Sequence, residues 1–310
     1  MSKIAFLFPG QGAQTIGMGK SIADKFISSS NIYDKASEAL GFDIKEMIFE
    51  GNEETLKLTE NTQPAILTTS IACLQPLLEA GIKADVTAGL SLGEYTSHVL
   101  AGTFSFETAV KLVRKRGRYM QDAVPAGIGT MAAIIGLSDD DVMKICKMAS
   151  SVGIVQAANF NCPGQVAIAG EIAAIEKACQ IAKEMGAKRA IILPVSAPFH
   201  CSMLEIAGTK LALELDKIKF EIMKIPVVTN VTAEYITDSS QVKDLLIKQV
   251  SNPVNFTGSI RAMLENGVDT FIEIGPGKAL SGFVKKINKE ARVFNIEDIE
   301  SLDCTLKGLI

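Results

Sequence analysis

Short apolar runs alternate with amphipathic segments along most of the chain, which is the pattern of a mostly parallel α/β sheet. The clearest strand-like runs are residues 4–8, 86–89, 225–229 and 270–274. A longer apolar stretch, residues 64–80, is interrupted by threonine, serine, glutamine and proline. It therefore predicts a buried helix rather than a membrane span.

A second pattern interrupts this alternation between Thr130 and Pro194. Its elements follow the order strand, helix, strand, strand, helix, strand, which is the ferredoxin-like βαββαβ order. In chain order they are 131–136, a helix opened by Ser138, 154–158, 165–169, 172–185 and 190–193. We expect a large α/β domain from residues 1–127 and 197–310, with a ferredoxin-like subdomain, residues 128–196, inserted into it. A cleft between two such units is a usual place for a substrate.

A possible nucleophile lies in the pattern Gly-x-Ser-x-Gly, centred on Ser91. The pattern follows a strand-like run and precedes a helix-like one, as the nucleophile elbow of α/β-hydrolases requires. The sharp turn exposes the serine hydroxyl, and the glycines leave room for the neighbouring strand and helix. A tight turn with a helix-capping serine is the plainer alternative. The context favours a large domain of α/β-hydrolase type with Ser91 as its nucleophile.

The chain offers only two imidazoles as a base for this serine. His98 lies about two helical turns beyond Ser91 on the same predicted helix, out of hydrogen-bond reach. His200 lies just after the predicted subdomain, where a loop can hold its ring over the serine. By elimination His200 is the predicted base.

Arg116 continues the apolar face of a helix predicted from residue 107 to about residue 121. Ala109, Leu112, Val113 and Met120 share its stripe at helical spacing. An arginine aimed inward must meet an anion, because an unpaired buried charge is costly. The anion is either a structural carboxylate or the carboxylate of a substrate held by the planar guanidinium.

Charge and cysteine content narrow the choice of partners. The formal net charge of −4 argues against a surface that attracts nucleic acid or anionic lipid. Six cysteines without a Cys-x-x-Cys pair, together with two histidines, make a metal site improbable and suggest reduced thiols in or near the core. The amino terminus has no signal-peptide pattern, so we expect a cytoplasmic location.

Seven motifs together resemble the malonyl-CoA:acyl carrier protein transacylase family over nearly the whole chain. They are Phe8-Pro9-Gly10-Gln11-Gly12-Ala13-Gln14, Gly89-Leu90-Ser91-Leu92-Gly93-Glu94-Tyr95, Arg116-Gly117, Asn161-Cys162-Pro163-Gly164-Gln165-Val166, Ala197-Pro198-Phe199-His200, Gln249-Val250-Ser251-Asn252-Pro253-Val254 and Glu273-Ile274-Gly275-Pro276-Gly277-Lys278. One departure is Leu90, where the family commonly has histidine, and it removes a polar neighbour of the site.

The resemblance implies roles for the matching positions. Ser91 would be the nucleophile, His200 the base, and Arg116 the clamp on the free carboxylate of malonate. The backbone N–H groups of Gln11 and Leu92 would form the oxyanion hole. Two supporting residues complete the implied site: Gln249, whose backbone carbonyl would orient the histidine, and Asn161.

The resemblance also implies the substrates: malonyl-CoA as donor, and the phosphopantetheine thiol of an acyl carrier protein as acceptor, in fatty acid or polyketide synthesis. It implies no cofactor and no metal, and we expect a monomer without membrane or nucleic-acid partners. Two alternatives stay open from the residues alone. One is a hydrolase of the α/β class, and the other is a subunit that binds acyl thioesters without turnover.

Overall fold

The computed structural model describes residues 2–195 and 197–309. Its strands form two sheets, one of six strands in the order β10-β9-β1-β2-β7-β8 and one of four in the order β4-β5-β3-β6. The strands are β1 Lys3–Phe8, β2 Val86–Gly89, β3 Gly129–Ile135, β4 Val155–Cys162, β5 Gln165–Glu171, β6 Arg189–Ile192, β7 Val227–Val228, β8 Tyr235–Ile236, β9 Val268–Ile274 and β10 Arg292–Ile296.

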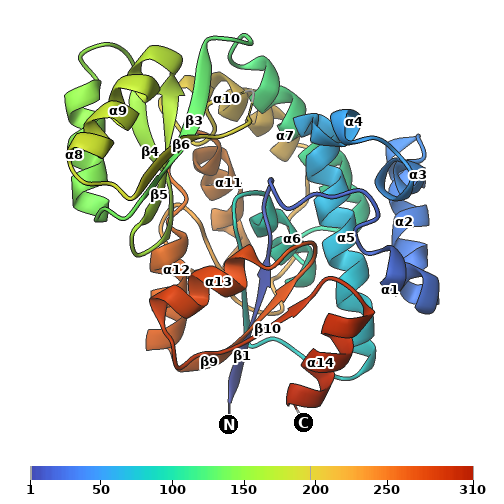
Figure 1. The fold of residues 1–310 in the computed structure, drawn as a ribbon. Helices are drawn as coiled ribbons and strands as arrows, with labels where there is room; N and C mark the ends of the chain where they lie inside the picture. Colours follow the sequence, from blue (N-terminus) through green and yellow to red (C-terminus); the bar gives the residue numbers. More distant parts are fainter. Residues whose placement is uncertain (1, 196, 310) are drawn as a thin grey trace.

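Helices connect the strands and cover the sheets (Figure 1). The α-helices are α1 Lys20–Lys25, α2 Ile27–Leu40, α3 Ile44–Phe49, α4 Glu53–Lys57, α5 Thr59–Glu79, α6 Leu92–Leu100, α7 Phe106–Asp122, α8 Asp139–Ala149, α9 Ile172–Glu184, α10 Glu205–Leu215, α11 Val242–Ser251, α12 Phe256–Glu265, α13 Ala279–Ile287 and α14 Ile299–Leu309. Two short 3-10 helices span Ser202–Leu204 and Ser239–Gln241.

The six-stranded sheet is parallel from β10 to β7, and only the short strand β8 joins it antiparallel. The prediction of a mostly parallel sheet is confirmed, and its four predicted strands correspond to β1, β2, β7 and β9. Sequence reasoning did not name β8 and β10. The first has two residues, and the second mixes its apolar residues with Arg292 and Asn295, so neither forms a continuous apolar run.

Successive side chains of β1 point to opposite faces of this sheet, and a different layer of helices covers each face. Phe6 and Phe8 pack into a core that includes residues of α2, α5, α6 and α7. Ala5 and Leu7 point the other way, into a core with residues of α12 and α13. This is the period of two expected of a strand buried on both faces. Figure 1 shows α5 on one side of β1 and α12 and α13 on the other.

The four-stranded sheet is antiparallel throughout, with the β4-β5-β3-β6 order expected of a ferredoxin-like unit. Helices α8 and α9 cover its outer face, where Ile134 and Ile168 join their core. Met131 and Ala167, on the opposite face, belong instead to the core of the large sheet. The predicted division at 127/128 and 196/197 stays a prediction, and its residue 196 and outer ends, residues 1 and 310, lie outside the described residues.

Backbone hydrogen bonds also join the antiparallel sheet to the large part of the molecule. Phe160 on β4 donates its N–H to the carbonyl of Val254 at 2.9 Å, and Val254 donates to the carbonyl of Ala158 at 2.8 Å. Val254 precedes α12, which packs against the face of the large sheet that carries Ala5 and Leu7. Strand β4 is therefore attached to the segment that leads into α12, in addition to the chain connections between the two parts.

The long apolar stretch near residue 70 forms α5, most of whose residues are buried, as predicted. Within residues 2–195 and 197–309, no helix is both long and apolar enough to cross a membrane. All cysteines are free, and five are buried. Cys304 on α14 is exposed, so the expectation of thiols in or near the core holds for the other five only.

Candidate active site

Ser91 occupies the turn between β2 and α6 in a strained conformation, with φ 51° and ψ −102°. Such a backbone costs on the order of 1–3 kcal/mol and persists only where its surroundings enforce it. The flanking glycines permit the turn. A Cβ on Gly93 would lie 2.0 Å from the carbonyl oxygen of Phe8, and one on Gly89 would lie 1.9 Å from the carbonyl carbon of Gly93. The strand-turn-helix context expected of a nucleophile elbow is present.

His200 is the imidazole beside this serine. Its Nε2 lies 2.7 Å from Ser91 Oγ, and its Nδ1 lies 2.8 Å from the backbone carbonyl oxygen of Gln249. Because a carbonyl oxygen only accepts, Nδ1 carries the proton and Nε2 is left to accept from the serine hydroxyl. Burial, and after it the charge of Arg116, lower the pKa of His200 to about 3. The ring is thus neutral near pH 7, as a base must be.

His98 is buried on α6 and directed elsewhere. Its Nδ1 lies 3.2 Å from Thr103 Oγ1, and its Nε2 lies 4.0 Å from Glu94 Oε1. Its ring packs at 5.7 Å from that of Phe104. These contacts make His98 a packed residue of α6.

Arg116 reaches the serine from α7 and is almost completely buried. Its Nη2 donates to Ser91 Oγ at 3.1 Å and to Gln249 Oε1 at 2.9 Å. Its Nη1 donates to Gln63 Oε1 at 2.8 Å. Within the described ranges, no carboxylate lies within 4.0 Å of this guanidinium. Of the two predicted kinds of anion, a directly paired structural carboxylate does not fit these contacts.

A close approach at Gly117 and a contact with the Tyr95 ring fix the position of the Arg116 side chain. A Cβ on Gly117 would lie 2.5 Å from the carbonyl oxygen of Thr59, so glycine at this position lets α7 approach α5 closely. The guanidinium carbon of Arg116 lies 5.1 Å from the centre of the Tyr95 ring, within range of a cation–π contact. The side chain is therefore held from several directions before any ligand arrives.

An amide network that sequence reasoning did not identify holds the backbone of the serine. The N–H of Ser91 donates to Asn230 Oδ1 at 2.7 Å, and its carbonyl accepts from Gln249 Nε2 at 3.0 Å. Glu94 Oε2 accepts from the same Gln249 Nε2 at 2.7 Å and from the backbone of Asn230 at 2.9 Å. Burial raises the pKa of Glu94 to about 7. Gln249 thus contacts the serine, the histidine and the arginine at once.

A cleft of about 570 Å³ opens over Ser91, His200 and Arg116. Gln11 and Leu92 line it from the large part of the molecule, and Asn161, Met131 and Ala167 line it from the antiparallel sheet. Leu92 is the first residue of α6, so its N–H has no acceptor within the helix. The structure therefore brings every sequence-predicted site residue to one cleft or, for Gln249, directly beneath it.

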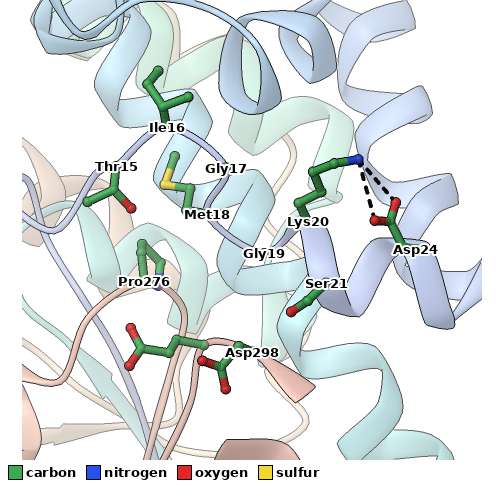
Figure 2. A pocket seen from close by; sticks show the side chains of 11 residues that line it. Thr15, Ile16, Gly17, Met18, Gly19, Lys20, Ser21, Asp24, Pro276 and Asp298 are labelled. Atoms are coloured by element: carbon green, nitrogen blue, oxygen red, sulfur yellow. Dashed lines mark hydrogen bonds and ion pairs between the residues drawn. The ribbon is translucent and has the colours of Figure 1, made fainter. Parts of the chain in front are cut away.

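A second hollow, of about 470 Å³, lies between the segment 15–21 and the segment around residue 298 (Figure 2). No histidine lines it. Its charged groups already have partners: Lys20 pairs with Asp24, and Asp298 accepts from the backbone of Ser301. Across the described part of the chain, no cluster of three or more histidine, cysteine or acidic side chains could hold a metal ion.

Known proteins match this chain along its length. The acyl transferase domain family matches residues 5–304. The chain belongs to the acyl transferase family. A malonyl CoA-acyl carrier protein transacylase of Bacillus subtilis (strain 168) is 47% identical to this acyl transferase over 310 residues, which are 100% of the chain and 98% of that protein.

Solved structures share the whole fold of this acyl transferase. A malonyl CoA-acyl carrier protein transacylase from Clostridium perfringens has a TM-score of 0.97 at 51% identity, covering 99% of this chain and 97% of that one. A type II PKS acyl-carrier protein bound to its malonyl-transacylase gives a TM-score of 0.97 at 40% identity, covering 99% and 100%. The family resemblance predicted from the motifs is confirmed.

Proposed function

We propose that this acyl transferase moves a malonyl group from malonyl-CoA, through an ester on Ser91, to the phosphopantetheine thiol of an acyl carrier protein. The relatives named above carry this activity in their names. The observation that carries the proposal is the position of Arg116. Its guanidinium lies 3.1 Å from Ser91 Oγ and, among the described residues, makes no ion pair with a carboxylate within 4.0 Å, so it can receive the carboxylate of an anionic acyl group.

The first half-reaction forms the acyl-enzyme. Ser91 Oγ attacks the thioester carbonyl while His200 Nε2 takes its proton. The tetrahedral oxyanion rests on the backbone N–H groups of Leu92 and Gln11, and the amino end of α6 adds its dipole. When the C–S bond breaks, the proton on His200 passes to the leaving sulfur, and CoA departs as a thiol. The malonyl group remains as an ester on the serine.

The second half-reaction reverses these steps with a different thiol. The phosphopantetheine thiol enters the cleft, gives its proton to His200, and attacks the ester carbonyl. The C–O bond then breaks and Ser91 Oγ takes the proton back. Two half-reactions through one covalent intermediate give ping-pong kinetics. No step needs a metal or cofactor, and we assign the reaction to the cytoplasm and the working unit to a monomer.

The partner of His200 favours transfer over the hydrolase alternative. A hydrolase triad of this class places a carboxylate behind the histidine. Here the group behind His200 is the backbone carbonyl of Gln249, at 2.8 Å. A neutral partner stabilises the imidazolium less than a carboxylate does, which suits attack by an acidic thiol better than attack by water.

Incubation with malonyl-CoA alone, followed by intact-mass measurement, tests the proposal. We expect one malonyl adduct per chain that persists without a thiol acceptor and disappears when holo acyl carrier protein is added. Rapid release of malonate in the absence of acceptor would instead identify a hydrolase. No adduct and no turnover would identify a protein that only binds thioesters.

The carboxylate role of Arg116 makes a separate prediction, tested with Arg116→Ala. Malonyl transfer should fall relative to acetyl transfer by roughly thirty-fold to several thousand-fold, because a buried two-pronged ion pair is worth about 2 to 5 kcal/mol. Arg116→Lys should recover only part of the loss, since an ammonium lacks the paired planar contact. The measurement is kcat/KM for malonyl-CoA and acetyl-CoA with each variant.

Arg118→Ala is the matched control, because Arg118 lies on the same helix with an exposed side chain that pairs with Asp122. It should leave both rates and their ratio unchanged. An Arg116→Ala enzyme that lost both activities equally, with a lowered melting temperature, would show that the arginine serves the fold and not the substrate.

A further inference from the structure

The strand β7 ends beside the nucleophile turn. Its register pairs Thr87 with Val227 and Ala88 with Val228. Continued by one residue, this parallel register would direct the carbonyl of Gly89 to the backbone N–H of Asn230. The backbone of β2 turns away at Ser91, so the ladder ends at this point.

The side chain of Asn230 continues the ladder where the backbone cannot. Its backbone N–H donates to Glu94 Oε2 at 2.9 Å, and its Nδ2 donates to the carbonyl of Gly89 at 2.6 Å in place of that N–H. Its Oδ1 accepts the N–H of Ser91 at 2.7 Å. One carboxamide therefore bridges the backbone on both sides of Leu90, across the strained turn.

The surroundings of Asn230 leave this carboxamide little freedom. The residue is fully buried. Its backbone carbonyl accepts from the N–H of Asn255 at 2.8 Å, and Gln249 Nε2 lies 3.3 Å from its Oδ1. Because the backbone N–H and carbonyl of Asn230 and both polar atoms of its side chain are hydrogen-bonded, its carboxamide has a fixed position next to the turn. Arg116 and His200 are not among its hydrogen-bond partners.

We propose that Asn230 is a positioning residue for acylation, whose carboxamide holds the Ser91 backbone so that Oγ stays in line with His200 and the oxyanion site. The proposal rests on Ser91 being the nucleophile. Without the two amide contacts, the turn can relax toward a less strained backbone and carry Oγ away from the imidazole. Misplacement of a reacting atom by about 1 Å can cost on the order of a hundred-fold in rate.

Asn230→Ala tests this inference through the rate of acylation per folded molecule. We expect a loss on the order of 10- to 100-fold with malonyl-CoA and an equal loss with acetyl-CoA, because Arg116 is not disturbed. A fluorophosphonate probe, which reports serine activation without a thioester, should slow by a similar factor. A probe rate equal to that of the unaltered protein would overturn the proposal. Because the probe needs no thioester, a failure of the malonyl assignment can be distinguished from a failure of the proposed role of Asn230.

Asn255→Ala is the matched control, which shows whether a general loss of stability in this segment is enough to slow the reaction. Asn255 holds the same segment through its backbone, and its side chain caps α12 by accepting from Gly258 at 2.9 Å. It should lower the melting temperature but leave probe and acylation rates within about two-fold, since cap losses act on stability. An equal rate loss in this control would reduce Asn230 to a structural role.

Asn230→Asp covers the case in which the alanine variant does not fold. It is nearly isosteric and keeps an acceptor for the Ser91 N–H, but it replaces the donor to Gly89 with an oxygen. It should fold and react with the probe more slowly than the unaltered protein. A fully reactive Asn230→Asp enzyme would exclude the Gly89 contact from the positioning role and overturn the proposal.

Discussion

Ser91→Ala is expected to abolish covalent labelling by malonyl-CoA while leaving the fold intact. The hydroxyl is the only nucleophilic atom of this residue, and the contacts that hold the turn use its backbone N–H and carbonyl, which alanine retains. Alanine also matches serine in its Cβ, so it adds no strain at φ 51°. Intact-mass measurement after incubation with malonyl-CoA, together with a melting curve, checks both parts of the expectation.

Ser97→Ala provides the comparison on the same helix. Ser97 is buried on α6, and its hydroxyl lies 3.1 Å from Thr87 Oγ1, away from the cleft. Its removal should cost about 1 kcal/mol of stability, the usual worth of a buried hydrogen bond, and leave labelling complete. A malonyl adduct that persisted in Ser91→Ala, on any residue, would overturn the assignment of the nucleophile.

His200→Ala is expected to slow acylation by two to four orders of magnitude, the usual scale for the loss of a positioned base. Because burial and Arg116 lower the pKa of His200 from 6.5 to about 3, the ring stays neutral as the pH falls through 6.5. The unaltered enzyme should therefore keep its acylation rate below pH 6.5, where an ordinary imidazole would already be protonated. Stopped-flow acylation across the pH range measures both effects.

His98→Asn tests whether the other imidazole was wrongly set aside. Asparagine can keep a hydrogen bond to Thr103, so the variant should fold. Its acylation rate should stay within a few-fold of that of the unaltered protein. If His98→Asn lost as much rate as His200→Ala, the assignment of the base would be wrong.

The parts of the site that follow local rules could be predicted from the sequence. Ser91 is defined by a five-residue pattern between a strand and a helix, and Arg116 by its place in a helical stripe. His200 followed from elimination, because only one of two imidazoles could reach the serine. The larger sheet was predictable for the same reason, since short apolar runs indicated β1, β2, β7 and β9, four of its six strands.

The amide network could not be predicted, because its contacts join residues that are far apart in sequence. Asn230 lies 139 residues from Ser91, and Gln63 lies 53 residues from Arg116. Asparagine and glutamine are common on surfaces, so their presence alone indicates no site. One signal was available. Asn230 directly follows a predicted parallel strand, and the carboxyl ends of such strands are where ligands bind in open α/β sheets.

The backbone attachment along β4 has a consequence for how substrates enter. If the four-stranded sheet and its helices were joined to the rest of the molecule only by the two chain connections, they could rotate as a rigid body about those connections. The hydrogen bonds between Phe160, Ala158 and Val254 restrain this part of the molecule at a further point. We expect the opening to behave as a slot of constant width, into which a reactant must be threaded end first. A thioester on a long, slender arm meets that requirement, and a compact, bulky ester does not. We therefore expect the attachment of β4 to the segment before α12 to favour slender substrates over bulky ones, independently of the catalytic residues.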